Sequence, residues 1–348
     1  MSARRDSPTA ARRGPAVGRT VGALVGVLVA AFLAGCAGPA ASATSTGRTT
    51  VVVASLKGPT TMGLVKLMDD ATRGAGAQDY RVTVYGSPDQ VVPLLVQGKV
   101  DVALLPANLA AVLYHRTTTG DGPAVQVAAV NTLGVLALVE HGDTVRTWAD
   151  LRGRTVVTTG KGTTPEYVLD YLLRKNGLDP GRDVTVELES EATALASRVV
   201  TTPGTVAVLP QPYTTVVERQ NPDVRTVMDL TDEWGKVADL GSRLVTGVLV
   251  VRTAFAWEHP QALADFLADY QASTQYTNDD PAGAAALVAA AGIVPDASVA
   301  QAAIPSCHIV YLDGEPMKTA LSGYLQVLYD ADPRSVGGAV PGDDFYRA

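Results

Sequence analysis

One stretch of this sequence occurs twice with the same plan, and the repeat limits the possible folds more than any other feature. Residues 51–68 (VVVASLKGPTTMGLVKLM) and 156–173 (VVTTGKGTTPEYVLDYLL) each place an apolar run before a Lys-Gly turn, paired threonines and a helical pattern. Downstream, residues 101–112 (DVALLPANLAAV) and 205–216 (TVAVLPQPYTTV) share an apolar run, a proline and a helix start. The separation is 49 positions from Lys57 to Pro106, and again 49 from Lys161 to Pro210. The two copies themselves are offset by 104 positions, from Lys57 to Lys161. Because a repeat this long exceeds the period of solenoid repeats, it predicts two similar α/β lobes that face each other.

The order of the elements is expected to be the same in both lobes. Strands are predicted at 51–54, 81–85 and 100–105. One helix is expected after the turn at 57–61 and runs to about residue 72, a second follows the turn at 86–89, and a third starts at residue 108; the order recurs from residue 155 to about 230. Such alternation predicts two Rossmann-like lobes with mixed, mostly parallel sheets covered by helices. In sheets of this kind ligands bind at the carboxyl ends of the strands, where the turns meet.

Two apolar segments are expected to cross between the lobes and form a two-segment hinge. Residues 125–139 predict two strands around a polar turn at residues 131–134, and residues 245–251 predict a return strand with Gly247 at a close approach. Helices are then predicted at 260–271, 281–290, 296–302 and 315–329, with an extended segment at 305–312. The predicted first lobe covers 51–136 and 246–348, and the second covers 137–245.

The first 36 residues have the layout of a signal peptide. Five arginines precede a continuous apolar run at 21–34, which closes with Leu-Ala-Gly-Cys at 33–36. This closing motif resembles the lipobox of bacterial lipoproteins, which implies cleavage after residue 35, acylation of Cys36 and a lipidated flexible tether at 36–50. An ordinary signal peptide and an uncleaved anchor helix are the alternatives, although the run is short for a membrane span. Gly14-Pro15 after Arg12-Arg13 favours Sec export over twin-arginine export.

Charge and cysteine content exclude several classes of protein. Cleavage removes five Arg and one Asp from 28 basic and 35 acidic residues, leaving a balance of −11 without a basic cluster, which argues against nucleic-acid binding. With Cys36 acylated, Cys307 is the remaining thiol, so neither an internal disulfide nor a Cys-based zinc site is expected. We expect Cys307 to be a buried small apolar residue. His308 is expected inside a buried strand, and the four histidines lack metal-pair spacing, so we predict no metal, no cofactor and no catalytic residues.

Taken together, the lipobox, the two linked lobes, the strand-Pro turns and the segment IPSCHIVYL at 304–312 before a last helix resemble a known family. The chain resembles the substrate-binding lipoproteins of ABC importers in the nitrate/sulfonate/thiamine-precursor group, with a type II periplasmic-binding-protein fold. The resemblance implies a monomer on the outer face of the cell membrane that passes a small polar or anionic ligand to permease and ATPase subunits. Two alternatives stay open, namely a same-fold enzyme of pyrimidine-precursor or menaquinone type and a lipoprotein that senses a ligand without transport.

The predicted ligand site consists of the turns that follow the strands. Such turns place backbone N–H groups and hydroxyls before a helix N-terminus, which suits an anion or another hydrogen-bond acceptor. Helix capping by the hydroxyls and solvation of the lysines are the alternative roles. Gly162 follows Lys161, so the turn lacks the Walker A order, and no Arg lies in these turns to clamp a carboxylate. The candidate ligand contacts are Lys57, Gly58, Thr60, Thr61, Ser87, Asn108, Asn131, Thr132, Lys161, Gly162, Thr163, Thr164 and Gln211.

Overall fold

The computed structural model describes residues 47–238 and 242–347. The residues from Gly47 onward belong to one compact unit. The predicted signal peptide, most of the predicted tether and the predicted acylation site Cys36 lie outside the described residues. Within the described ranges, no helix has both the length and the apolar character that crossing a bilayer would need.

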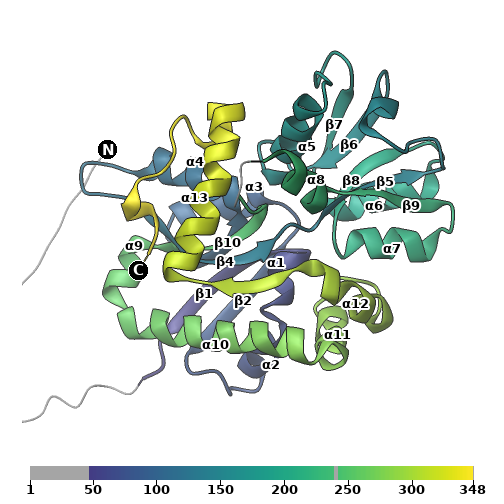
Figure 1. Cartoon of the computed structure of the whole chain (residues 1–348). Helices are drawn as coiled ribbons and strands as arrows, with labels where there is room; N and C mark the ends of the chain where they lie inside the picture. The colour runs from purple at the N-terminus through teal and green to yellow at the C-terminus, as the bar shows by residue number, and fades with distance from the viewer. Residues whose placement is uncertain (1–46, 239–241, 348) are drawn as a thin grey trace, which may run out of the picture. The chain divides into compact units, whose positions relative to one another are not determined.

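Six strands form the first sheet, in the spatial order β11-β4-β10-β3-β1-β2 (Figure 1). They are β1 (Thr50–Leu56), β2 (Asp79–Tyr85), β3 (Val102–Pro106), β4 (Val125–Leu133), β10 (Val245–Arg252) and β11 (Ile309–Leu312). Strand β1 pairs in parallel with β2 and β3, whereas β10 pairs antiparallel with β3 and β4. The parallel pairing is therefore confined to the β-α-β-α-β unit, and the strands that enter after a crossing run the opposite way.

Five strands form the second sheet, in the order β7-β6-β8-β5-β9. They are β5 (Leu136–His141), β6 (Thr155–Thr159), β7 (Thr185–Glu189), β8 (Val206–Pro210) and β9 (Val224–Asp229). Strand β6 is parallel to β7 and β8, and β5 is antiparallel to β8 and β9. The register repeats as well, since Val53 pairs with Val102 in one sheet and Val156 with Val206 in the other. The predicted pair of mixed α/β lobes is thus confirmed.

We call the first sheet and its helices the first lobe, and the second sheet and its helices the second lobe. The helices of the first lobe are α1 (Pro59–Met62), α2 (Val65–Thr72), α3 (Pro88–Val96), α4 (Ala107–Thr117), α9 (Thr253–Glu258), α10 (Pro260–Asp279), α11 (Pro281–Ala290), α12 (Ala297–Ala303), α13 (Gly314–Ala331) and the short turns η2 (Ile304–Cys307), η3 (Pro333–Val336) and η4 (Asp343–Phe345). Those of the second lobe are η1 (Trp148–Leu151), α5 (Thr164–Lys175), α6 (Ala192–Thr201), α7 (Tyr213–Gln220) and α8 (Leu230–Val237).

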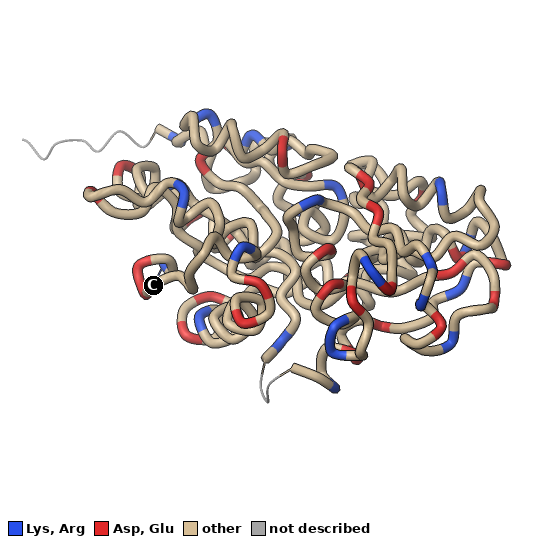
Figure 2. The backbone as a smooth tube through the Cα atoms, turned by 90° about the horizontal axis from the view of Figure 1, so that it is seen from above, with Lys and Arg blue, Asp and Glu red and all other residues tan. Residues whose placement is uncertain are grey.

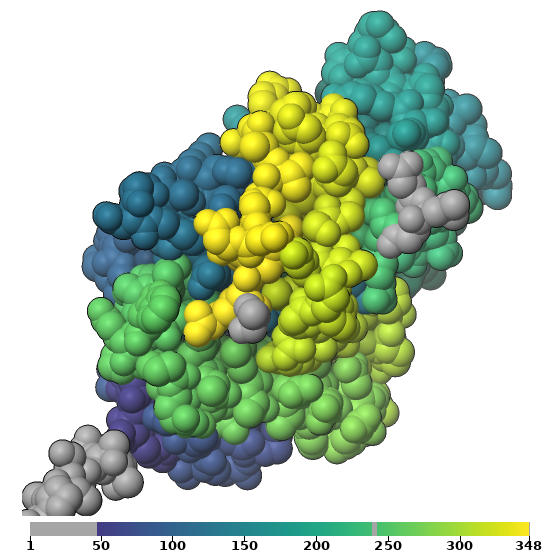
Figure 3. Space-filling model, turned by 60° about the vertical axis from the view of Figure 1, so that its left-hand side comes forward, coloured from purple at the N-terminus to yellow at the C-terminus, as the bar shows by residue number. Residues whose placement is uncertain are grey.

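Apolar side chains from both lobes meet at one end of the molecule. Helix α13, yellow in Figure 3, lies between the two lobes and packs on α5. The buried ring of Tyr324 in α13 stands 5.4 Å from that of Trp234 in α8, and Trp234 stands 4.9 Å from Tyr171 in α5 (centroid distances). These three large rings bury apolar area between the lobes, which stabilises their contact.

Some predicted elements differ from the structure. Instead of a turn at 57–61 followed by one helix to about Thr72, the structure has α1 inside the expected turn and α2 as a separate helix. The two are separated at Gly63, which packs so closely that an added Cβ would lie 3.0 Å from Thr274 Oγ1. Helix α10 runs eight residues past the predicted end at 271, because Ser273 and Thr277 are buried and hydrogen bonded rather than solvated. Helix α9 was not predicted at all.

The segment at 305–312 also corrects the expectation. Its first part is the helical turn η2, and only Ile309–Leu312 is extended. His308 is exposed, ends η2 with a left-handed φ of 42°, and pairs through Nδ1 with the carbonyl of Gly134, so it is not a core strand residue. Cys307 is buried as predicted, and burial raises the pKa of its thiol.

Candidate functional site

The turns after the parallel strands of both lobes surround one cavity of about 100 Å³, which we call the interlobe cavity. From the first lobe it is lined by Leu56, Lys57, Pro59, Thr60, Gly86, Pro88, Pro106 and Thr246, and from the second by Leu136, Thr159, Gly160, Thr163, Thr164, Pro165, Ser190, Ala192 and Pro210. The two sets correspond, because residues after β1, β2 and β3 face residues after β6, β7 and β8. The repeat therefore builds the cavity from matching turns.

The buried threonines of the cavity differ in what their hydroxyls do. Thr60 donates to the carbonyl of Leu56 at 3.0 Å, and Thr163 donates to the carbonyl of Gly160 at 2.5 Å. By contrast, Thr246 at the start of β10 is only 9% exposed, and its Oγ1 has no hydrogen-bond partner. A buried hydroxyl without a partner carries a desolvation cost, so it marks a place where a bound molecule would gain a hydrogen bond.

The backbone amides of the turns do not point into the cavity as expected. Lys57 N–H donates to the carbonyl of Tyr85 at 2.9 Å, and Gly160 N–H donates to that of Glu189 at 3.1 Å. Each of these bonds continues the backbone pairing between two parallel strands, β1 with β2 and β6 with β7, by one residue. The amide of Gly162 donates instead to the carboxylate of Glu166 in α5. The prediction that these turns aim several free N–H groups at one spot is wrong for these amides.

Four of the candidate ligand contacts line the interlobe cavity, namely Lys57, Thr60, Thr163 and Thr164. Ser87 lies between two lining residues, and Gly58 precedes α1 with a left-handed φ of 124°. Whether any of these side chains contacts a ligand stays a prediction.

The other candidates do not line the cavity. Thr61 is buried and bonds to Ser55 and to the Leu56 carbonyl, while the side-chain oxygen of Gln211 bonds to Thr215. Lys161 is exposed, and Gly162 closes the turn beside it.

Asn131 and Thr132 correct the expected polar turn between the crossing strands. Both are buried inside β4, where Thr132 pairs with Gly247. An added Cβ on Gly247 would clash with Asn131 Oδ1, so the side chains of Asn131 and Thr132 occupy the space next to this glycine. The chain crosses between the lobes at residues 134–135 instead.

Asn108 connects the two lobes beside the cavity. It is fully buried at the start of α4, and its Nδ2 donates to the carbonyl of Gly162 in the second lobe and to that of Ser335 in the first, each at 3.0 Å. Its Oδ1 accepts from the hydroxyl of Thr164 at 3.2 Å, and Tyr324 in turn donates to that hydroxyl at 3.3 Å. Every polar group of this side chain is engaged, which indicates a structural role between the lobes.

Other residues connect the lobes through packing. The ring of Tyr213 in α7 lies 3.7 Å from the position of a Cβ on Gly58. An added Cβ on Gly86 would lie 2.5 Å from the carboxylate of Glu191, so the turns of the two lobes approach each other closely here. The hydroxyl of Tyr213 is buried without a partner, and burial together with the charge of Glu191 raises its pKa.

Several lining residues were not among the sequence-based candidates. Ser190 follows β7 as Gly86 follows β2, so the repeat itself contained the signal for this position. Thr246 and Leu136 stand at the starts of the strands that follow the two crossings, and no local motif distinguishes them.

Charge is sparse in the interlobe cavity. Lys57 is its one charged lining residue among the described residues, and it is exposed. Figure 2 shows that basic and acidic residues are interspersed along the chain. Over 47–238 and 242–347, no group of three or more His, Cys, Asp or Glu side chains is placed to hold a metal ion.

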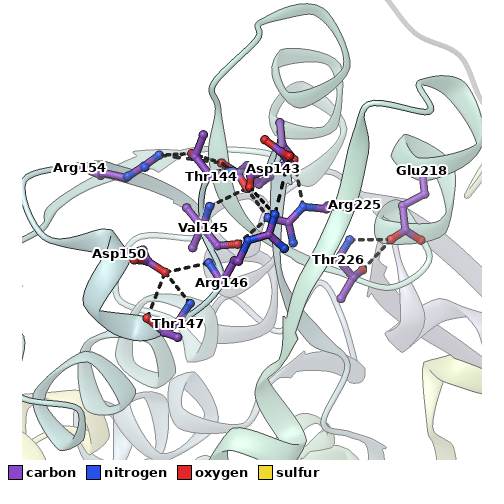
Figure 4. Close-up of polar contacts among 12 residues, drawn as sticks. Asp143, Thr144, Val145, Arg146, Thr147, Asp150, Arg154, Glu218, Arg225 and Thr226 are labelled. Atoms are coloured by element: carbon purple, nitrogen blue, oxygen red, sulfur yellow. Dashed lines mark hydrogen bonds and ion pairs between the residues drawn. The ribbon is translucent and has the colours of Figure 1, made fainter.

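A second polar cluster lies in the second lobe, away from the cavity lining, and centres on the buried carboxylate of Glu140 (Figure 4 shows the surrounding residues). Glu140 accepts hydrogen bonds from Thr144 and from the Val145 amide, and an ion pair joins it to Arg225 at 2.7 Å. Burial alone would raise the pKa of Glu140, but these bonds outweigh it and hold the pKa below its usual value. Arg154, just before β6, lies 3.8 Å from the same carboxylate. Because all its partners belong to the second lobe, in the turn after β5, on β9 and next to β6, we assign this cluster to stability.

Proteins of known structure share this fold. The structure is similar to that of an ABC transporter protein from Parabacteroides distasonis (23% identity, TM-score 0.68), over 86% of this chain and 99% of that one. It is also similar to the periplasmic aliphatic sulphonate binding protein SsuA from Escherichia coli (16% identity, TM-score 0.64), over 84% and 97%. In sequence, the chain is 25% identical over 143 residues to "Putative binding protein YtlA" of Bacillus subtilis (strain 168) and spans 41% of its length.

The sequence profile of one family, described as NMT1/THI5 like, matches residues 79–284. The matched region includes more than half of the chain and runs from β2 through the whole second lobe to α11. The chain therefore belongs to the NMT1/THI5-like family.

Proposed function

We propose that this protein is an extracytoplasmic solute-binding lipoprotein that captures a small polar or anionic ligand between its lobes and delivers it to an ABC permease. The observation that carries the proposal is the interlobe cavity, which is bounded by matching turns of both lobes at the carboxyl ends of their parallel strands. A ligand that touches both lobes binds more tightly when the lobes are close together than when they are apart. This difference in affinity shifts the equilibrium toward the closed state.

Similar proteins support the same reading. The periplasmic aliphatic sulphonate binding protein from Escherichia coli shares the fold over most of both chains. The crossing at residues 134–135, between β4 and β5, is where the lobes would turn relative to each other. Acylation of Cys36 would hold the protein at the outer face of the membrane, next to the permease.

The experiment begins with a thermal-shift screen of the mature chain against sulfonates, nitrate, pyrimidines, amino acids and polyamines. A ligand that binds the folded state raises the melting temperature by mass action. Small-angle scattering with and without the ligand found in the screen then measures compaction. A smaller radius of gyration with ligand supports the proposal, and identical curves would count against capture by lobe closure.

A double variant tests whether the cavity is the site. Thr163→Ala with Thr164→Ala removes two hydroxyls from the cavity wall and is expected to weaken binding by about 1–3 kcal/mol. Ser197→Ala in the exposed part of α6 is a matched control that removes a hydroxyl outside the interlobe cavity. Equal affinities of the double variant and the control would move the site elsewhere.

A further inference from the structure

The interlobe cavity offers few hydrogen-bond donors to a ligand. Five of its lining residues are prolines, which have no N–H: Pro59, Pro88, Pro106, Pro165 and Pro210. Three of them stand in the first turn of α1, α3 or α5, where free N–H groups would otherwise meet an anion. The helix N-termini at this cavity therefore lack part of the usual anion-binding geometry.

Several of the remaining polar groups are already committed as donors within the protein. The hydroxyls of Thr60 and Thr163 give their protons to carbonyls of their own turns, so their oxygens keep lone pairs for a ligand. The amides of Lys57 and Gly160 are bonded to the neighbouring strands, and that of Gly86 is bonded to the side chain of Gln90 at 3.1 Å. These commitments leave the wall with acceptor oxygens at Thr60 and Thr163, and with side-chain donors at Thr159, Ser190, Thr246 and the exposed Lys57.

Negative charge already occupies the helix ends around the cavity. The first turn of α3 contains Asp89, Glu191 precedes α6, and Glu166 in the first turn of α5 accepts from the Gly162 amide. These carboxylates complement the partial positive charge of the helix N-termini. A second anion in the cavity would be repelled by them, and the exposed ammonium of Lys57 is screened by solvent.

Among the buried hydroxyls that line the cavity, those of Thr159 and Thr246 make no hydrogen bond, and that of Thr246 is also shielded from solvent. The hydroxyl of Thr246 lines the cavity, is more than nine-tenths buried and has no partner. It can donate one hydrogen bond to a ligand acceptor, while the oxygens of Thr60 and Thr163 accept from ligand donors. This combination matches a small molecule that has one acceptor and several N–H or O–H donors.

From this donor and acceptor pattern we propose that the interlobe cavity selects an uncharged small molecule rich in hydrogen-bond donors, such as an amide, over an oxyanion of the same size. The inference rests on the proposed solute-binding function and specifies its ligand class. It also assigns Thr246 as a residue that contacts the ligand and determines specificity.

Three probes of nearly identical size and different charge test the inference, namely acetate, acetamide and acetamidinium. Their binding to the mature chain is measured by thermal shift and calorimetry at equal concentrations. We expect acetamide to bind tighter than acetate by about tenfold or more. The N–H groups of acetamide can donate to a threonine oxygen of the wall, whereas acetate has no donor and leaves that hydrogen bond unmade. Raising the salt concentration should leave the acetamide affinity unchanged, because no ion pair forms.

Substitutions of Thr246 test whether the preference for acetamide arises in the interlobe cavity. Thr246→Val removes the hydroxyl at constant shape and should reduce acetamide binding by about tenfold, whereas Thr246→Ser should retain it. Equal binding by the Val and Ser variants would overturn the assignment of Thr246. If the Val variant does not fold, loss of binding in a folded Thr246→Ala with retention in the Ser variant gives the same answer.

The outcomes separate this inference from the proposed function. Tighter binding of acetate or of acetamidinium overturns the ligand class and leaves solute binding standing. Absence of binding by all three probes overturns the ligand class as well. The proposed function fails on different data, namely if no compound of the wider screen binds and scattering shows no compaction.

Discussion

Asn108 offers the most informative single substitution, because its side chain bonds both lobes at once. Replacing it with Leu keeps the branched shape of the side chain and removes three hydrogen bonds, to Gly162, Ser335 and Thr164. The site is buried, so the former partners lose their bonds without gaining water. At about 1 kcal/mol for each lost bond, the free energy of unfolding should fall by about 3 kcal/mol.

The assay is urea unfolding followed by tryptophan fluorescence, with small-angle scattering of the ligand-free protein as a second readout. Two of the three lost bonds join the lobes, so the radius of gyration of the Asn108→Leu variant should increase. Asn176→Leu is the matched control, because the Asn176 amide bonds only within α5, to Leu172 at 2.8 Å. The control should lose about 1 kcal/mol and keep its scattering curve. Equal losses for the two variants, together with unchanged scattering, would refute the structural role of Asn108.

Three further predictions concern other parts of the chain. Glu140→Gln should lower the free energy of unfolding by about 3 kcal/mol in urea titrations, because it leaves Arg225 without its buried partner, while Asp143→Asn on the surface should change it by less than about 1 kcal/mol. Since the folded-state pKa of Glu140 is lowered, its contribution is present above the unfolded pKa and is lost as the pH falls through the folded pKa, so an acid titration of stability that stays flat there would contradict the role. Gly247→Ala places a Cβ against Asn131 and should cost about 1–3 kcal/mol, measured by thermal unfolding. Cys36→Ala should release the protein from membranes on fractionation, and a variant that stays membrane-bound would refute the lipid anchor.

The local patterns of the sequence were sufficient to predict the lobes. Each β-α-β-α-β unit has its strands, turns and helices in one contiguous stretch, and the repeat of Lys57 to Pro106 at Lys161 to Pro210 showed that the units correspond. Placing the ligand site at the turns followed from the parallel strands, and four of the predicted residues line the cavity.

The sequence-based predictions are wrong where contacts between distant parts of the chain determine the structure. The turn at Gly160–Gly162 has the composition of an anion-binding loop, but the Gly160 amide is taken by β7 and that of Gly162 by Glu166, which the pattern alone does not show. Thr246 reaches the cavity only because the chain returns there after the whole second lobe. His308 was placed in a strand from its apolar neighbours, whereas the preceding turn η2 puts it on the surface.

A crystal structure of the protein with the ligand found by screening tests the central claim most directly. The account predicts ligand density inside the interlobe cavity, within hydrogen-bond distance of Thr246, of Thr60 in the first lobe and of Thr163 in the second. Density on the surface of a single lobe, with the interlobe cavity filled by water, would contradict it.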